Sequence, residues 1–472
     1  MRSRILLHSV GPVLLLALAA PAVAGGSSKA DPSRVLPPGA VPEDARLGKP
    51  RTLDDAYHPW APPATKEAWE GEAERIRTQL LVSNGLWPMW PRTPLDPVIH
   101  GRIDRGEYTI EKVYFASLPG HYVTGNLYRP KKLDHKAPGV LCPHGHWANG
   151  RFYEAGEGEA RNQIASEAEQ HEAGARFPLQ ARMATLARLG CVVFHYDMVG
   201  YADSQSIPHR QGFTDAEASL RLQNAMGLQT WNSIRALDFL LSLPDVDAER
   251  IGVTGASGGG TQTFMLCAVD PRPAVAFPAV MVSTAMQGGC VCENADYLRL
   301  GINNIAIAAV FAPKPQALSG ADDWTIDIET KGLPELRQVY SLYAAADRVQ
   351  AKCWPQFKHN YNQVAREMMY AWFNEHLKLG HEGPIAEADF EPVPPKELSV
   401  WDEAHPVPDD AKSAQELRED LTRVSQEQFA ALVSKDAQTL AEYRRVIGAA
   451  ARVLLDAGVP AADEIELKLA DS

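Results

Sequence analysis

Residues 251–259 read Ile-Gly-Val-Thr-Gly-Ala-Ser-Gly-Gly, with Ser257 near the end. The first four residues form a short apolar run, as in a buried strand, and a helical pattern begins at about residue 259. A Gly-x-Ser-x-Gly turn between strand and helix needs small residues beside the serine and lifts its hydroxyl clear of the sheet. Free N–H groups at the helix N-terminus favour negative charge there. The stretch predicts Ser257 as a nucleophile, the alternative being a tightly packed structural turn.

Apolar runs and helical segments alternate on both sides of this stretch, as in a mostly parallel sheet covered by helices on both faces. The further apolar runs are 139–142, 191–194, 275–282, 316–318 and 349–357, and the helical segments are 178–189, 216–243 and 364–377. Residues 108–115 and 122–128 alternate in polarity around Pro119-Gly120, which predicts an antiparallel hairpin before the parallel strands. The expected fold class is α/β.

The chain is predicted to divide into five parts. They are a signal peptide (1–24), a leader and arm (25–100), the α/β domain (101–385), a Pro-rich linker (386–411) and a helical extension (412–472). Within the α/β domain, the polar segment 148–180 interrupts the alternation, and long structureless insertions are usually functional caps. We therefore expect it to lie near the active site.

The N-terminus has the pattern of an export signal. Arg2 and Arg4 precede an apolar run over 10–20, and Ala22-Val23-Ala24 forms a small-x-small cleavage site. The run is too short to span a bilayer, and no later stretch is long enough. We expect cleavage after Ala24 and a secreted or periplasmic protein, the alternative being a buried N-terminal helix.

Composition narrows the range of partners. The 472 residues carry a formal net charge of -13, which argues against nucleic acid or an anionic membrane as the main partner. Six cysteines allow disulfides in an exported protein, but spacing does not choose among the pairings. Cys290-Val291-Cys292 lacks the spacing of a zinc knuckle, and we expect no metal and no cofactor.

A serine hydroxyl needs a base, and the base needs a group that orients it. His359 follows the last predicted strand and precedes a helix, so it is the predicted general base, ahead of His376, His381 and His405. The acid should follow the preceding strand, and Asp323 is predicted there, with Asp322 the near alternative.

The oxyanion of a tetrahedral intermediate needs two N–H donors. Gly258, directly after the nucleophile, should supply one. The loop Pro143-His144-Gly145-His146-Trp147 should supply the other from the backbone of His146, with Trp147 a close alternative.

A metal site is the competing interpretation of the same loop. His144 and His146 stand one residue apart at a strand end, and His195 and Asp197 follow the next strand. The serine turn explains more of the chain, and we expect the metal site to be absent.

Substrate contacts are predicted close to these residues. Trp147, Trp324 and Tyr361 could stack on a sugar face, with core packing as the alternative. Arg151 and Arg161, in the insertion, could pair with an acidic sugar such as a uronate, with a solvated surface as the alternative.

The residues together resemble the bacterial acetyl xylan esterase-like branch of the α/β-hydrolases, related to the dienelactone hydrolases. The resemblance covers about residues 75–385. It rests on residues 86–88, 122–130, 142–146, 255–259, 323–324 and 359–361. It implies the α/β-hydrolase fold, a Ser257-His359-Asp323 triad, no cofactor, and hydrolysis of carboxylic esters. Many relatives are thought to deacylate plant or algal polysaccharides.

The expected function is therefore that of a secreted serine esterase acting on a polysaccharide or oligosaccharide ester. An esterase that cleaves uronate esters is one alternative. A serine peptidase of prolyl-oligopeptidase type shares the turn and the order of the triad, but the chain before the first strand is short for a gating domain. A retired, non-catalytic hydrolase scaffold is the remaining alternative.

Overall fold

The computed structural model describes Ala40, residues 60–433 and residues 435–455. The predicted signal peptide and its cleavage site lie outside these residues. So do most of the leader up to residue 59 and the end of the chain from residue 456.

A single sheet of nine strands runs through the described residues, in the order β1-β2-β3-β5-β4-β6-β7-β8-β9. Strands β4 to β9 are parallel to one another. Strands β1, β2 and β3 are antiparallel to the strands that they pair with. The strands are β1 Val98–Asp104, β2 Tyr108–Leu118, β3 His121–Pro130, β4 Ala137–Leu141, β5 Val192–Tyr196, β6 Val246–Ala256, β7 Val275–Ala279, β8 Gln316–Ala321 and β9 Val349–Trp354. The predicted hairpin is β2–β3, and the mostly parallel sheet is confirmed.

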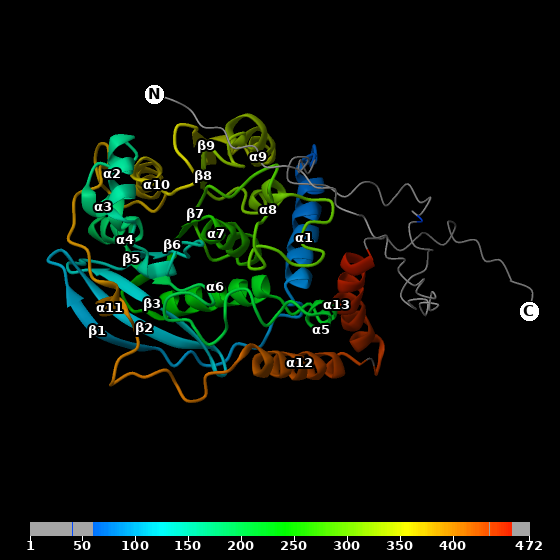
Figure 1. Cartoon of the computed structure of the whole chain (residues 1–472). Helices are drawn as coiled ribbons and strands as arrows, with labels where there is room; N and C mark the ends of the chain where they lie inside the picture. The colour runs from blue at the N-terminus through cyan, green and yellow to red at the C-terminus, as the bar shows by residue number, and fades with distance from the viewer. Residues whose placement is uncertain (1–39, 41–59, 434, 456–472) are drawn as a thin grey trace, which may run out of the picture. The chain divides into compact units, whose positions relative to one another are not determined.

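Helices cover both faces of this sheet, as its apolar strands require. Helices α4 (Pro178–Arg188) and α10 (Gln363–His376) lie on one face (Figure 1). The other face carries α6 Ala225–Ser242, α7 Gly258–Val269, α8 Asn304–Ala309 and α9 Leu333–Ser341. Helix α1 (Lys66–Ser83) packs outside α7 and α8.

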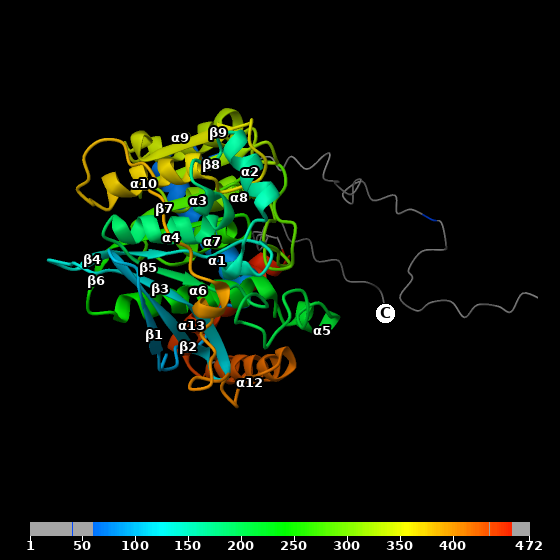
Figure 2. The ribbon, with the colours of Figure 1, turned by 60° about the vertical axis from the view of Figure 1, so that its left-hand side comes forward.

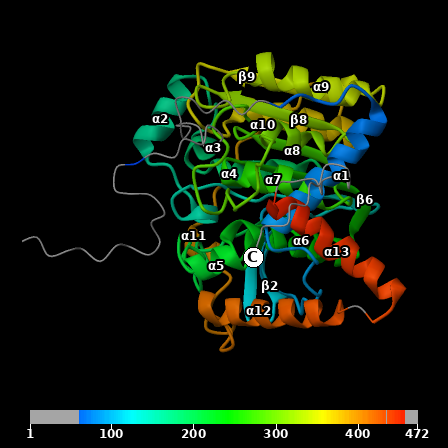
Figure 3. The same cartoon turned by 90° about the vertical axis from the view of Figure 1, so that its right-hand side faces the viewer.

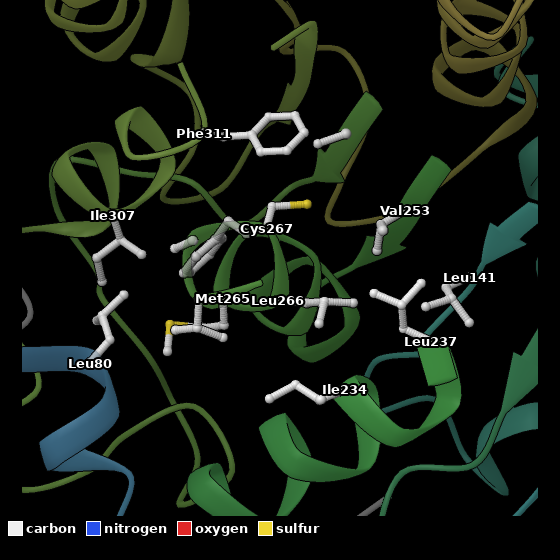
Figure 4. Packing of buried hydrophobic residues seen from close by; sticks show 14 of the residues in the cluster. Leu80, Leu141, Ile234, Leu237, Val253, Met265, Leu266, Cys267, Ile307 and Phe311 are labelled. Atoms are coloured by element: carbon white, nitrogen blue, oxygen red, sulfur yellow. The ribbon is translucent and has the colours of Figure 1, made fainter. Parts of the chain in front are cut away.

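Helix α7 is buried along its whole length. Figure 4 shows Met265, Leu266 and Cys267 packed among side chains of the neighbouring helices and strands, including Ile234 of α6 and Ile307 of α8. A helix that is buried on every side gains much of its stability from the burial of its apolar side chains. The packing fixes the N-terminus of α7 and, with it, the position of Ser257.

The segment 216–243 is two helices instead of the single predicted one. Helix α5 (Ala216–Leu220) ends before Leu222, which has a φ of 53°, and α6 begins after Asn224. The Asn224 side chain accepts a hydrogen bond from the Gly227 N–H at 2.7 Å. An asparagine N-cap of this kind starts a new helix within an apolar period that looks continuous in the sequence.

Strand β1 was not predicted, and it spans the expected boundary at residue 100 between the arm and the α/β domain. Its residues are partly buried or exposed, because the strand forms the edge of the sheet beside β2. Its polar composition, Val-Ile-His-Gly-Arg-Ile-Asp, therefore does not resemble that of the buried strands.

The insertion 148–180 is helical, whereas the sequence suggested a structureless segment. It contains the 3₁₀ turn Gly150–Phe152, α2 (Glu157–Ala165) and α3 (Glu172–Arg176). Glu169, between these helices, pairs with the buried Arg366 of α10 at 2.8 Å. The insertion is thus fastened to the domain by a buried ion pair.

The predicted linker 386–411 packs against the domain. Val393, Leu398 and Val400 are buried, and α11 (Pro395–Leu398) lies within the segment. The Glu387 carboxylate accepts a hydrogen bond from the Arg366 Nε at 2.8 Å, so the same arginine holds this segment and the insertion.

Within the described residues, the predicted helical extension contains α12 (Ala414–Ala431) and α13 (Ala437–Leu455). Leu417 and Leu421 of α12 are buried in the core. Helix α13 lies beside α1 (Figures 1 and 3), and the Trp87 indole N–H donates to the Val446 carbonyl at 2.9 Å. Figure 2 shows α12 below β1 and β2.

Two short turns complete the described structure, Ile328–Gly332 and Ala346–Arg348. Among the described helices, none combines the length and the apolar composition needed to cross a membrane.

Candidate active site

Ser257 stands at the junction of β6 and α7. Its φ of 57° and ψ of −127° lie in a region that is strained for a residue with a side chain. Its N–H donates to the Ala279 carbonyl of β7 at 3.2 Å, which helps to hold the turn. This is the geometry predicted for the Gly-x-Ser-x-Gly stretch.

The glycines around Ser257 are required by the loop that follows β4. A Cβ atom added at Gly255 would lie 2.5 Å from the Pro143 carbonyl oxygen, and one at Gly259 would lie 2.4 Å from the same atom. Both distances are far below van der Waals contact. Only residues without a side chain fit beneath this loop.

His359 and Asp323 meet at the carboxyl ends of β9 and β8. The distance from His359 Nδ1 to Asp323 Oδ2 is 2.7 Å. The other carboxylate oxygen accepts hydrogen bonds from the Thr325 N–H at 2.6 Å and the Thr325 hydroxyl at 2.5 Å. With the carboxylate as acceptor, the neutral imidazole carries its proton on Nδ1, and Nε2 keeps its lone pair.

The alternatives to this pair have other partners. Asp322 pairs with the Lys358 ammonium. His376 packs against Trp372, His381 faces the Leu189 carbonyl, and His405 pairs with Asp402. Of the residues weighed from the sequence, Asp323 and His359 are the acid and the histidine that lie together.

Residues Gly145 and His146 lie directly against the Ser257 turn. A Cβ at Gly145 would lie 2.6 Å from the Ala256 carbonyl oxygen and 2.8 Å from Ser257 Cβ. A Cβ at Gly258 would lie 3.1 Å from the His146 ring. The two residues expected to supply oxyanion donors, Gly258 and His146, are therefore neighbours beside the serine.

The metal site considered at His144, His146, His195 and Asp197 is not assembled. His144 Nδ1 donates to the Gly145 carbonyl at 2.8 Å, and Nε2 accepts from the Met198 N–H at 3.1 Å. Burial lowers the His144 pKa to about 3, so the ring stays neutral and serves to fix the loop.

Arg151 lies inside the protein, with only 2% of its area exposed. Its guanidinium donates to Asp197 at 2.8 Å and to Asp203 at 2.6 Å. The expectation that Arg151 binds substrate is therefore corrected: its charge is already balanced by two buried carboxylates. Arg161 lies on the exposed surface of α2, 3.6 Å from Glu157.

Of the aromatic residues predicted to contact a sugar, two lie beside His359 and one lies in the core. Trp147 and Tyr153 line a cleft of about 130 Å³ together with His359, Lys358 and Asn360. The Trp324 ring packs against the His359 ring, with the centroids 4.6 Å apart. In contrast, Tyr361 is buried, and its hydroxyl is 2.8 Å from that of Thr254, which places it in the core and away from any sugar.

Comparisons with known proteins agree with this fold, and the chain has the architecture of an α/β-hydrolase. It resembles the solved structure of methylesterase BT1017, with a TM-score of 0.61 and 27% identity over 78% of each chain. It also resembles BF1801 of Bacteroides fragilis NCTC 9343, described as a candidate acetyl xylan esterase, with a TM-score of 0.48 and 16% identity, covering 65% of this chain and 81% of that one.

Among curated proteins, the chain is 28% identical over 172 residues to YtaP of Bacillus subtilis (strain 168), a candidate hydrolase. The match covers 36% of this chain and about half, 52%, of YtaP. No family model matches the chain. The likeness to methylesterase BT1017 confirms the predicted resemblance to esterases of this fold and agrees with the predicted class of enzyme.

Proposed function

We propose that this protein is a serine carboxylic-ester hydrolase acting on a carbohydrate ester. The observation that carries the proposal is the 2.7 Å contact between Asp323 and His359, on two loops at the carboxyl edge of the sheet where Ser257 also lies. A nucleophile, a base and an orienting acid on separate strands form the arrangement that acyl transfer needs.

The chemistry follows from the atoms present. As Ser257 Oγ bonds to the ester carbonyl carbon, its proton passes to His359 Nε2, and the carbonyl electron pair moves to oxygen. Asp323 stabilises the imidazolium that results. Backbone N–H groups of Gly258 and His146 would stabilise the oxyanion. Collapse expels the alcohol, which takes the proton from His359, and water repeats the sequence on the acyl-enzyme to release the acid.

The cleft beside His359 is where we place part of the sugar substrate. Trp147 and Tyr153 line it from the loop after β4 and from the insertion, and aromatic faces suit the apolar faces of sugar rings. On this basis the insertion 148–180 shapes the substrate site as a cap.

A second candidate is the cleavage of methyl esters of uronate sugars. The relative with the TM-score of 0.61 is a methylesterase. Both candidates use the same triad and differ in whether the acyl or the alcohol part belongs to the polysaccharide. Release of acetate from acetylated xylan or of methanol from methyl-esterified pectin would separate them.

A peptidase of prolyl-oligopeptidase type would need a gating domain. Between Trp60 and β1 the described chain contains the helix α1 and the extended arm that follows it. We expect turnover of nitrophenyl esters and none of peptide anilides.

Export completes the proposal. The chain is proposed to be secreted or periplasmic after removal of residues 1–24, and the measurement is N-terminal sequencing of the protein recovered outside the cytoplasm. A first residue at Gly25 is expected, while an intact Met1 in a cytoplasmic protein would contradict the proposal.

The decisive test is hydrolysis of p-nitrophenyl acetate by the protein and by Ser257→Ala. Loss of the nucleophile should lower kcat by at least ~10³-fold, because triad residues act as a unit. Labelling by a fluorophosphonate probe should disappear as well. Ser341→Ala, an exposed serine of α9, is the matched control. Activity or labelling that survives Ser257→Ala would refute the proposal.

A further inference from the structure

Four potential metal ligands meet close to Gly258, the residue after Ser257. His146, His209, Cys290 and Cys292 each present a ring nitrogen or a sulfur, and these atoms all lie within 4.8 Å of one another. The residues belong to the loops after β4, β5 and β7. We refer to these four side chains as the thiol–imidazole cluster.

The individual distances pair each histidine with one cysteine. His146 Nε2 is 3.2 Å from Cys292 Sγ, and His209 Nε2 is 3.5 Å from Cys290 Sγ. The bond lengths of zinc to nitrogen and sulfur place neighbouring ligands of a tetrahedral ion about 3.5 Å apart. The two histidine–cysteine distances match those of a four-coordinate zinc site, and all four ligand atoms lie within 4.8 Å of one another.

The second nitrogen of each histidine has an acceptor behind it. His209 Nδ1 donates to the Val199 carbonyl at 2.7 Å, so Nε2 holds the lone pair that faces the sulfur atoms. His146 Nδ1 lies 3.6 Å from the buried carboxylate of Glu293. Such partners orient metal-binding histidines and fix their tautomer.

Glu293 also holds the loop that carries the cysteines. Its other carboxylate oxygen accepts hydrogen bonds from the N–H groups of Gly289 at 2.7 Å and Cys290 at 3.1 Å. Both cysteines are buried, and both are free thiols in this structure. The donor set is thus preformed and partly shielded from water.

We propose that the thiol–imidazole cluster binds one Zn²⁺ ion through two thiolates and two neutral imidazoles. Two sulfur and two nitrogen donors in tetrahedral dimensions suit zinc. On binding, Cys290 and Cys292 each release a proton to solvent, and the two thiolate charges balance the ion. All four positions are filled by protein, so the site is structural.

The position of the site indicates what the ion stabilises. Residues 280–303, between β7 and α8, contain no helix or strand, and the cysteines lie in the middle of this long loop. The ion would fasten this loop to the loops that carry His146 and His209. This is a larger constraint than hydrogen bonds alone provide.

One consequence rests on the proposed function. His146 supplies a ligand through its side chain and an oxyanion donor through its backbone, and its ring lies against Gly258. The zinc ion would position the oxyanion loop without touching the substrate, and His209, Cys290 and Cys292 are positioning residues.

The test is the metal content of the full chain purified with one equivalent of Zn²⁺ and dialysed. We expect one zinc per chain by elemental mass spectrometry. The ion should be lost in Cys290→Ser, Cys292→Ser and His209→Ala, and retained in Cys353→Ser, a buried cysteine of β9. Replacement by Co²⁺ should give intense visible bands and a near-ultraviolet thiolate-to-cobalt transition, both absent from the same three variants.

Three outcomes would overturn the proposal: metal-free protein with all six thiols titratable, copper in place of zinc, or a Cys290–Cys292 disulfide that makes the native protein two hydrogens lighter. Circular dichroism of the variants separates metal loss from failure to fold. Zinc binding is expected to persist in Ser257→Ala, so failure of the esterase proposal and failure of the metal proposal are distinguishable.

Discussion

Two groups of side chains near Ser257, the triad side and the cluster side, are built in different ways. On the triad side, His359 and Asp323 follow adjacent strands and are 36 residues apart. On the other, His146 and Cys292 are in contact although 146 residues separate them. The first pair follows from where parallel strands end, while the second depends on how three long loops fold over the same edge.

The difference predicts different costs of substitution. In the proposed mechanism His359 transfers the proton, and Asp323 holds its tautomer through a hydrogen bond. The proposed zinc site would act only through the position of a loop. Removing a chemical group should therefore cost orders of magnitude more activity than removing a ligand from the cluster.

The largest effect should follow Asp323→Asn. The amide cannot stabilise an imidazolium and favours the wrong tautomer, so kcat should fall by about 10³–10⁴-fold. Asp322→Asn is the matched control, because it removes only the exposed pair with Lys358 and should change kcat by about fivefold or less. Steady-state kinetics on p-nitrophenyl acetate measures both. Equal losses in the two variants would contradict the assignment of the acid.

Gly145→Ala should come next, because it perturbs the loop shared by both sides. The new Cβ would lie 2.6 Å from the Ala256 carbonyl oxygen, so the loop must shift. A displacement of about 1 Å at a catalytic site can lower the rate about 10²-fold. Gly158→Ala is the control, since a Cβ there meets no atom within 4 Å. Wild-type kcat/KM in Gly145→Ala would show that the loop supplies no essential donor.

We expect the Cys292→Ser substitution, in the thiol–imidazole cluster, to lower activity less than the two substitutions above. Loss of the ion would loosen the His146 loop, lowering kcat about 10-fold with KM nearly unchanged, and would lower Tm. Cys292→Asp keeps an anionic ligand and should recover part of kcat together with the cobalt spectrum. A loss of kcat as large as that of Asp323→Asn would mean that the cluster takes part in the chemistry.

The smallest effect on the chemical step should follow Trp147→Ala. The side chain lines the cleft beside His359, so its removal should raise KM for a polysaccharide ester about 10-fold and affect p-nitrophenyl acetate less. Tyr443→Ala, on the exposed surface of α13, is the control. An equal change for both substrates would place Trp147 in the packing of the loop instead.

Arg151 and Arg161 show where prediction from the sequence fails. Both lie in a polar insertion and look alike from composition. In the structure, Arg151 is buried between Asp197 and Asp203, while Arg161 remains on the surface. The carboxylates that bind Arg151 lie in the loop after β5, and no local pattern connects the two segments.

The sequence by itself determined most of the sheet and the turn at Ser257, and it predicted His359 as the base. These follow from local rules: apolar runs form buried strands, glycines permit the tight turn, and strands end at one edge. It favoured Asp323 over Asp322, but only the hydrogen bond to His359 distinguishes the two neighbours.

Only the tertiary structure decided the break between α5 and α6, the packing of the segment 386–411 and the roles of Arg151 and Tyr361. It also brought together His146, His209, Cys290 and Cys292. Each depends on contacts between segments distant in sequence, and such contacts are fixed by the packing of the whole chain. Periodicity and spacing describe only what neighbouring residues do.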